Sequence, residues 1–297
     1  MNTALLPTAA LPTPALPTVI VPVFNALEVV DACLASLDRT LPVGTRVLIA
    51  DDASTDPRIA TLLEHWRRAS PCATQVRTRE RNLGFVGNAN AAFADTGDQD
   101  VVLLNSDTVT TGGWLQRIAA CAASDPRIAT ITPWSNNAEI CSFPELCEDN
   151  PVPEDAHLLA LAAASAGAPA YPDLPTGVGF CLYIRRAALH EVGDFDAATF
   201  GRGYGEENDF CLRAAGLGWR NVLCDDAYVV HIGNASFGPS REHAGGENMR
   251  RLVVRWPHYQ QQIAEYIMAD PLRPLRERIQ RRLAQLQHPR AQLDMFD

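Results

Sequence analysis

Short apolar runs alternate along this chain with longer segments whose apolar residues recur every three or four positions. The runs of the first half are 18–23, 46–50, 101–104 and 128–132. Short runs rich in Val, Ile and Leu and bounded by turn residues are typical of buried strands. The segments with helical spacing or an Ala-rich composition are 28–37, 57–68, 84–94 and 114–123. The alternation predicts right-handed βαβ units and an α/β fold with a mostly parallel sheet.

The pattern is less regular in the second half. We predict an acidic, proline-containing surface loop at 141–153. The predicted strands are 180–184, 221–224 and 227–231, and the predicted helices are 155–166 and 206–215. Asp56 and Asp155 lie where helices are expected to begin, so both are candidates for the N-cap.

Three segments follow from this pattern. Residues 1–17 carry no charge and are interrupted by four prolines, which predicts a flexible arm rather than a signal peptide. Residues 18–240 form the predicted α/β domain. From about Arg241 the pattern becomes helical, so 241–297 is predicted to be a helical C-terminal extension.

Composition narrows the class of protein. The hydrophobic content of 47% is ample for a core, and the net charge of −10 argues against nucleic-acid binding, which needs a basic surface. The 8 cysteines include no CxxC pair, which favours a reduced, cytoplasmic protein over a zinc or disulfide framework. No apolar run reaches the roughly 18 residues that a transmembrane helix needs.

Two acidic clusters follow predicted strands directly. Asp51 and Asp52 come after 46–50, and Asn105-Ser106-Asp107 comes after 101–104. Ligands of open parallel sheets collect outside the carboxyl ends of the strands. An unpaired buried carboxylate is costly, so these groups are expected to face a cation, a nucleotide or a reacting hydroxyl. This placement indicates an enzyme.

Each cluster has a structural alternative. Asp52 can accept hydrogen bonds from a base or a ribose. Asp107 can bind a hard divalent cation that is shared with phosphate oxygens and water, although it could also be the tip of a β-turn. Glu206, Glu207 and Asp209 follow a turn with three glycines at 201, 203 and 205. They could stabilise a helix N-terminus, and one of them could be a general base behind a hinge or lid.

Two further residues are ambiguous without other information. His231 follows a predicted strand, where a lone histidine is usually structural, although it can bind a metal. Trp134 ends the 128–132 strand and is followed by Ser-Asn-Asn. A single tryptophan is more often a core residue than a platform for a ligand.

Taken in order, these segments resemble the family 2 glycosyltransferases, which have the GT-A fold with a Rossmann-like sheet. The similar segments are IVPVFN at 20–25, ADDASTD at 50–56, NLGF at 82–85, LLNSDT at 103–108, GVGFCL at 177–182, YGEENDF at 204–210, and His231 with Ser236. The resemblance covers about 18–240 and is closest to bacterial rhamnosyltransferases.

The resemblance implies a role for each matched residue. The nucleotide pocket would be lined by Pro22, Phe24, Asn25, Asp51, Asp52, Asn82 and Asn105. Asp107 and His231 would hold Mg²⁺ or Mn²⁺. Glu207 would be the general base, where the family usually has aspartate. The acceptor side would include Trp134, Gly177, Gly179, Glu206 and Asp209.

The implied activity is inverting transfer of a sugar from a UDP- or dTDP-sugar to a saccharide or lipid-linked acceptor, in surface polysaccharide or glycoconjugate synthesis. The implied location is the cytoplasm. Between 271 and 290 six arginines, one glutamate and a stripe of leucines predict a basic amphipathic helix. It could contact the inner membrane face peripherally, or pack on its own domain or on a partner chain.

Two other functions fit parts of the pattern. A nucleotidyltransferase also uses a nucleotide-binding α/β sheet, but it needs a Gly-rich basic loop near the first strand, and 22–27 is neither. A nucleotide-sugar-binding protein without turnover is the second alternative, and only an activity measurement separates it from an enzyme.

Overall fold

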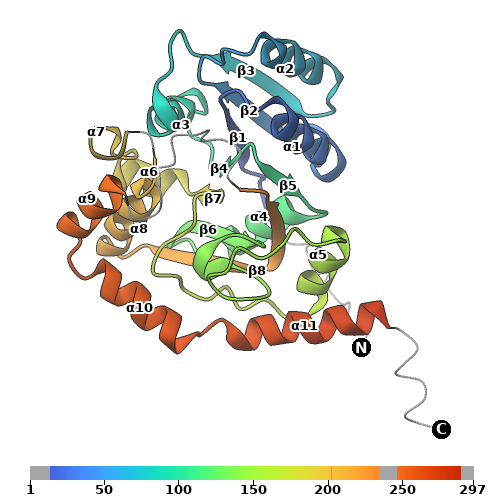
Figure 1. The fold of residues 1–297 in the computed structure, drawn as a ribbon, viewed down its shortest axis with the longest axis vertical. Helices are drawn as coiled ribbons and strands as arrows, with labels where there is room; N and C mark the ends of the chain where they lie inside the picture. Colours follow the sequence, from blue (N-terminus) through green and yellow to red (C-terminus); the bar gives the residue numbers. More distant parts are fainter. Residues whose placement is uncertain (1–13, 202, 234–245, 289–297) are drawn as a thin grey trace, which may run out of the picture.

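An eight-stranded mixed sheet with helices on both faces forms the centre of the computed structural model, which describes residues 14–201, 203–233 and 246–288 (Figure 1). The strand order is β3-β2-β1-β4-β7-β6-β8-β5. The strands are β1 (Thr18–Val23), β2 (Arg46–Asp51), β3 (Ala73–Thr78), β4 (Val101–Leu104), β5 (Thr108–Thr110), β6 (Ile128–Trp134), β7 (Cys181–Ile184) and β8 (Arg220–His231). The α/β prediction is confirmed.

Helices follow most of the strands. They are α1 (Leu27–Thr40), α2 (Pro57–Ala69), α3 (Gly84–Asp95), α4 (Trp114–Ser124), α5 (Ala156–Ser165), α6 (Arg186–Val192), α7 (Ala197–Phe200), α8 (Glu206–Gly216), α9 (Glu247–Arg255), α10 (Tyr259–Ala269) and α11 (Arg273–Gln287), with a 3₁₀ turn η1 (Glu139–Cys141). Asp56 caps α2 by accepting the Arg58 N–H, and Asp155 caps α5 by accepting the Leu158 N–H. Both predicted N-caps are therefore confirmed.

The sheet is parallel in its first half and mixed in its second half. β3, β2, β1 and β4 run in the same direction. β7 is antiparallel to both of its neighbours, β4 and β6, and β5 is antiparallel to β8. The carboxyl ends of β1, β2 and β4 therefore meet at the same edge, where the predicted site residues follow.

Both faces of the sheet are covered. Val19, Val21 and Val23 of β1 belong to one core cluster, which includes residues of α1, α2, α4 and α5. Ile20 belongs to a second cluster, which includes residues of α3, α8 and α9. Burial on both faces is the physical reason that these strands are continuous apolar runs.

Three expectations about strands are wrong. The segments 221–224 and 227–231 form a single strand, β8, in which the register shifts between Pro133 and Trp134 of the neighbouring β6. The shift accommodates Asp225 and Asp226, whose polarity suggested an interruption. The strands β3 and β5 were not predicted. β3 lies at the edge of the sheet and is largely exposed, so it lacks a clear apolar pattern.

The C-terminal extension packs on the domain that precedes it. Leu272 and Ile279 of the predicted amphipathic stripe are buried in the first core cluster, and Leu275, Leu283 and Leu286 pack against it. Arg278 of α11 forms an ion pair of 3.2 Å with Asp225 of β8. Because the apolar face of α11 is turned inward, the helix packs on its own domain, which is one of the three possibilities that its sequence pattern left open.

In the described ranges, none of the helices combines the length and apolar character that crossing a membrane requires. The predicted flexible arm at 1–17 falls mostly outside the described residues, as does Ser236.

Candidate active site

Two loops at the ends of β1 and β2 are joined by Asn25. The backbone N–H of Asn25 donates to the Ser54 hydroxyl at 2.9 Å. Its side-chain oxygen accepts hydrogen bonds from the N–H groups of Thr55 and Asp56 at 2.9 and 3.0 Å. Asn25 therefore shapes the edge of the predicted nucleotide pocket by holding its loops together. Asp51 contributes in the same way, because its Oδ1 accepts the Ser54 N–H at 3.1 Å.

Asp52 and Asn82 form the next part of this edge. Oδ1 of Asp52 accepts the Leu83 N–H at 2.7 Å, and the Asn82 amide donates to the Asp52 carbonyl at 3.2 Å. Burial raises the pKa of the Asp52 carboxyl above its usual value, although the hydrogen bond from Leu83 opposes this shift. Beside them Pro22 is buried in β1 and Phe24 exposes 39% of its surface. Hydrogen bonds thus tie Asn25 and Asp51 to the loop that follows β2, and Asn82 to Asp52.

Asp107 and His231 meet because β5 pairs with the end of β8, where Thr108 is opposite His231. Oδ1 of Asp107 lies 3.5 Å from Nε2 of His231. That is an ion-pair distance rather than a good hydrogen bond. Among the described residues, this Oδ1 and the side-chain oxygen of Asn105 are buried without a hydrogen-bond partner.

His231 is held on three sides. Its Nδ1 lies 2.7 Å from the Asn137 carbonyl, so Nδ1–H is the donor and Nε2 faces Asp107. The Asn136 side chain bonds both the N–H and the carbonyl of His231, each at 3.0 Å. The Phe180 ring stacks on the imidazole with centroids 5.2 Å apart. Burial lowers the pKa of His231, but the adjacent Asp107 carboxylate and the Asn137 carbonyl outweigh it, so the net shift is upward.

This arrangement fits a divalent cation. Carboxylate and amide oxygens with one imidazole nitrogen suit Mg²⁺ or Mn²⁺. Within the part of the chain that the structure describes, no cluster of three or more Asp, Glu, His or Cys side chains could hold a metal on its own. Phosphate oxygens and water would have to complete the coordination, as is usual for Mg²⁺ at phosphate sites.

The third acidic cluster opens α8. Gly203 and Gly205 before it have φ values of 111° and 107°, which residues with a Cβ rarely adopt. Burial raises the pKa of Glu207 from its usual 4.5 to about 7, and the charge of Glu139 from η1 adds to this shift. Burial and the charge of Glu207 raise the pKa of Glu206 well above its usual value. Both shifts favour the protonated form, and the pKa of about 7 leaves Glu207 able to accept a proton near neutral pH.

The segment around Gly177 and Gly179 passes close to Glu207. A Cβ on Gly179 would lie 3.5 Å from the carboxyl carbon of Glu207. A Cβ on Gly177 would lie 2.6 Å from a methyl carbon of Leu182, so no larger residue fits there. The backbone of this segment therefore runs directly beside the Glu207 carboxyl group.

The two sides of the site converge on Tyr204. Burial is the largest cause that raises the pKa of its phenol, and the negative charges of Asp107 and then Glu207 raise it further. Tyr204 therefore lies within electrostatic reach of both the Asp107–His231 pair and the Glu207 carboxyl.

Two predicted acceptor residues are placed differently. The Trp134 side chain is fully buried, and its indole N–H donates to the Asp225 carbonyl at 3.1 Å. Asp209 is also fully buried and is bonded by Arg213, Arg255 and Trp256. Both are internal residues, which corrects the expectation that their side chains contact an acceptor.

Sequence reasoning did not find several residues of the site. Asn136 and Asn137 hydrogen-bond to His231, and Phe180 stacks on its ring. The charge of Glu139 raises the pKa of Glu207. The Ser-Asn-Asn sequence at the end of β6 was a signal for the first two, because polar residues at a strand end often meet a site. Nothing in the sequence near Glu139 indicates its proximity to α8.

A parallel β3-β2-β1-β4 half-sheet, with Asp107 after β4 and a carboxylate-rich helix start opposite, defines the GT-A glycosyltransferase fold. The sequence model described as "Glycosyl transferase family 2" matches residues 18–193, which is more than half of the chain. The chain belongs to glycosyltransferase family 2. A search of curated protein sequences gives no significant match.

Solved structures support the fold. The chain resembles GalNAc-T7 with UDP, GalNAc and Mn²⁺ at a TM-score of 0.60 and 14% identity, covering 94% of this chain and 57% of that chain. It resembles residues 1–349 of S. aureus TarS with UDP-GlcNAc at a TM-score of 0.56 and 18% identity, covering 84% of this chain and 71% of that chain. It resembles the mannosyltransferase PcManGT from Pyrobaculum calidifontis with GDP-Man and Mn²⁺ at a TM-score of 0.53 and 17% identity, covering 94% of this chain and 75% of that chain.

Proposed function

We propose that this protein is a metal-dependent, inverting glycosyltransferase that moves a sugar from a nucleoside diphosphate to an acceptor hydroxyl. The observation that carries the proposal is the buried Asp107 Oδ1, which has no hydrogen-bond partner among the described residues and lies 3.5 Å from His231 Nε2. A carboxylate is left in this state at low cost only where a cation neutralises it.

Asp107 and His231 would hold Mg²⁺ or Mn²⁺, with Asn105 beside them. When bound, the cation neutralises the charge that develops on the departing nucleoside diphosphate. The GalNAc-T7 and PcManGT structures contain Mn²⁺, which supports this choice of metal.

Asp52, Asn82 and the exposed Phe24 would hold the nucleoside. The half-buried edge offers hydrogen-bond acceptors for a base or ribose and an aromatic face for stacking. We propose a UDP- or dTDP-sugar as the donor. TarS was solved with UDP-GlcNAc and PcManGT with GDP-Man, so the shared fold leaves the base open.

Glu207 would act as the general base. It removes the proton from the acceptor hydroxyl as that oxygen attacks the anomeric carbon from the face opposite the diphosphate. The new C–O bond forms while the bond from the anomeric carbon to the phosphate oxygen breaks, so the configuration inverts. The electron pair of the broken bond leaves with the diphosphate, and the proton remains on Glu207.

We propose a saccharide or lipid-linked acceptor in surface polysaccharide or glycoconjugate synthesis. The segment of Gly177 and Gly179, which runs beside Glu207, would form the acceptor side of the site. Burial raises the pKa of Glu206 and so favours its protonated form, which can donate a hydrogen bond to the acceptor.

The experiment is a screen of nucleotide sugars against the purified protein with Mn²⁺, with EDTA as the control. Thermal shift identifies the donor, and release of nucleoside diphosphate then reports turnover. NMR of the product from an α-linked donor should show a β-linkage. A retained configuration would disprove the inverting mechanism, and donor binding without release in any acceptor panel would favour a binding protein.

A further inference from the structure

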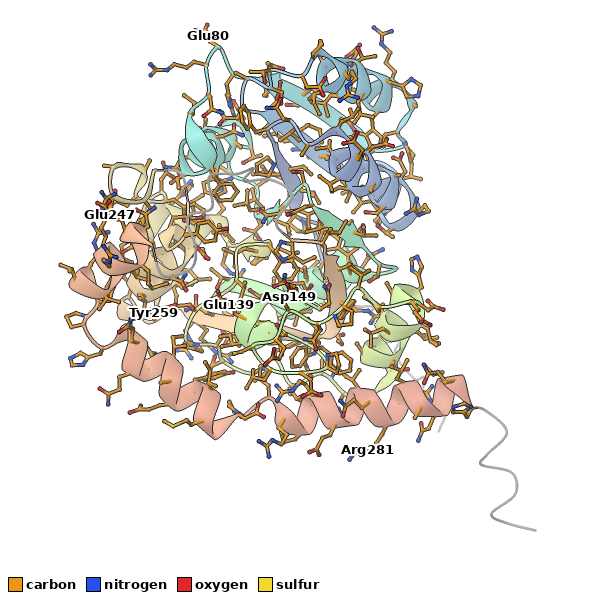
Figure 2. The ribbon with its side chains drawn as sticks, viewed as in Figure 1. Glu80, Glu139, Asp149, Glu247, Tyr259 and Arg281 are labelled. Atoms are coloured by element: carbon orange, nitrogen blue, oxygen red, sulfur yellow. The ribbon has the colours of Figure 1, made fainter. Side chains whose placement is uncertain are left out.

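Four side chains of the α9–α10 segment reach the start of α8. Figure 1 shows α9 beside α8, and Figure 2 labels Glu247 and Tyr259 at the beginnings of α9 and α10. The Asn248 amide donates to the carbonyls of Phe200 and Gly203, both at 2.8 Å. The Tyr259 hydroxyl bonds the Asn208 side-chain oxygen at 2.9 Å.

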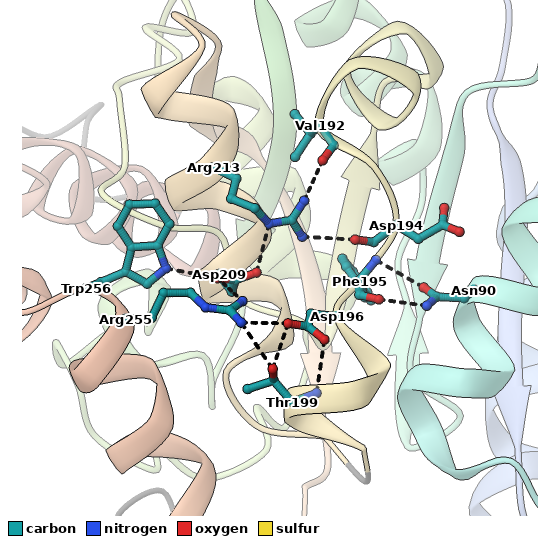
Figure 3. Close-up of polar contacts among 10 residues, drawn as sticks. All are labelled: Asn90, Val192, Asp194, Phe195, Asp196, Thr199, Asp209, Arg213, Arg255 and Trp256. Atoms are coloured by element: carbon teal, nitrogen blue, oxygen red, sulfur yellow. Dashed lines mark hydrogen bonds and ion pairs between the residues drawn. The ribbon is translucent and has the colours of Figure 1, made fainter.

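The other two side chains bond the buried carboxylate of Asp209. Its Oδ1 accepts from Arg255 at 3.0 Å and from the Trp256 indole at 2.9 Å, while its Oδ2 accepts from Arg213 at 2.8 Å (Figure 3). Arg213 and Arg255 extend these contacts to the 192–199 segment, since Arg213 also bonds the Val192 carbonyl and Arg255 also bonds Asp196. Asp209 thus joins α8, α9 and the 192–199 segment.

The contacted residues lie on both sides of Glu207 in the sequence. Asn248 fixes the turn that precedes it, and Asn208 and Asp209 are the next two residues of the same helical turn. That turn has little regular structure of its own, because Gly203, Tyr204 and Gly205 all have positive φ. Contacts from outside therefore decide where the Glu207 carboxyl lies. The family match ends at residue 193, so both α8 and the helices that hold it lie beyond it.

We propose that Asn248, Arg255, Trp256 and Tyr259 are positioning residues that set the place of the Glu207 carboxyl against the acceptor hydroxyl. This inference depends on the proposed function, because it assumes that Glu207 is the base. None of the four needs to touch a substrate. They act by fixing the helix start on which the base stands, and a small displacement of a reacting group lowers the rate strongly.

The test compares W256F and Y259F with the wild-type enzyme. Each variant removes one hydrogen bond to the first turn of α8, and each still has an aromatic side chain at that position. The expected result is a kcat lower by about 10-fold to 100-fold, with an unchanged KM for the donor and unchanged Mn²⁺ affinity. The acidic limb of the pH–rate profile should also shift, because a displaced Glu207 has a different environment.

Matched controls are available in the same chain. W219F removes an indole bond to Glu191, and Y266F removes a hydroxyl bond from α10 to the Asp173 carbonyl. Both bonds lie away from the start of α8, so kcat should stay within about twofold of wild type in each. Thermal unfolding of all four variants separates loss of folded protein from loss of rate.

The outcomes are distinguishable. Wild-type kcat and pH profile in W256F and Y259F, with E207Q inactive, would overturn the positioning role alone. Full activity of E207Q would instead overturn the proposed base. A fall in activity that matches the loss of folded protein would make these contacts merely structural. If W256F does not fold, Y259F decides, since it lacks only one oxygen atom.

Discussion

Glu207 is one methylene longer than the aspartate that is usual at this position in the family, and it lies beside a glycine segment that leaves room for the extra length. Gly179 would place a Cβ only 3.5 Å from the Glu207 carboxyl carbon. Its neighbour Glu206 is more deeply buried and has a pKa well above its usual value, so the two adjacent carboxyl groups are not equivalent. This difference supports the proposal that Glu207 rather than Glu206 is the base.

Replacing Glu207 by glutamine should lower kcat by about 10²-fold to 10⁴-fold, because the amide cannot accept the acceptor proton. Donor affinity should stay unchanged, since the residue is not part of the metal or nucleotide side of the site. Steady-state kinetics and calorimetry with the donor measure the two effects. Exposed Glu154 gives the control E154Q, and equal activity of E207Q and E154Q would contradict the assignment.

The raised pKa of Glu207 predicts opposite pH effects on rate and stability. The rate should increase as the pH rises through about 7, because the carboxylate is the active form. Between its usual pKa of 4.5 and about 7 the folded protein binds the proton more tightly than the unfolded chain. Stability therefore falls as the pH rises through this window. Urea unfolding at pH 5 and pH 8 should show that the free energy of unfolding falls less between these pH values in E207Q than in the wild type.

Asp107 has the corresponding role on the metal side. In D107A the Mn²⁺-dependent part of donor affinity should fall by more than about 100-fold, since loss of an outer-shell partner alone can lower metal affinity 10–100-fold. Calorimetry with donor, with and without Mn²⁺, measures the effect. Exposed Asp98 supplies the control D98A. Identical Mn²⁺ dependence in D107A and wild type would exclude Asp107 as a ligand.

At the scale of elements, α11 shows how an amphipathic pattern leaves its partner open. Its basic face and leucine stripe fitted a membrane surface, the same domain or another chain, with packing on a protein favoured. The structure turns the stripe toward the first core cluster and pairs Arg276 with Asp270 and Arg278 with Asp225. Packing on the domain is favoured because it buries apolar area and pairs Arg278 with Asp225 of β8, whereas Arg276 is paired with Asp270 within the extension itself.

Replacing Ile279 by alanine should lower the free energy of unfolding by about 2–5 kcal/mol, because the side chain is 2% exposed and its removal leaves a cavity. Arg281 on the exposed side of the same helix gives the control R281A, for which we expect a change within about 0.5 kcal/mol. Urea unfolding followed by circular dichroism measures both. Equal stability of the two variants would mean that α11 does not pack here in solution.

At the scale of the whole molecule, the C-terminal helices and the sheet share both core clusters. Leu272 and Ile279 lie in the first cluster, and Leu252 and Tyr259 lie in the second. Burial of four such side chains contributes roughly 6–12 kcal/mol at about 1.5–3 kcal/mol each. This is similar to the entire stability of a typical domain, about 5–15 kcal/mol.

A variant that ends after residue 246 should therefore fail to fold cooperatively, although it keeps every strand of the sheet. A variant that ends after residue 288 keeps α9, α10 and α11 and is the control. Solubility, circular dichroism and a urea transition check the expectation. A cooperative transition in the shorter variant would show that 18–240 is an independent domain.

The sequence by itself determined the α/β class, the two N-caps and the position of most strands and helices. These features depend on local periodicity, and burial on both faces makes β1, β2 and β4 unmistakable apolar runs. The sequence also indicated Asp52, Asp107 and the Glu206–Asp209 cluster, because polar groups at strand ends and helix starts stand out against such runs. Asn82 and the choice of Glu207 as the base came from the family resemblance.

The tertiary structure alone decided which distant residues meet. Pairing of β5 with β8 brings His231 to Asp107, and burial assigns Trp134 and Asp209 to the interior rather than to an acceptor. The contacts of Asn248, Arg255, Trp256 and Tyr259 with the start of α8 join segments about 50 residues apart. Local patterns report whether a side chain is apolar or polar, but its partner depends on the register and packing of the complete fold.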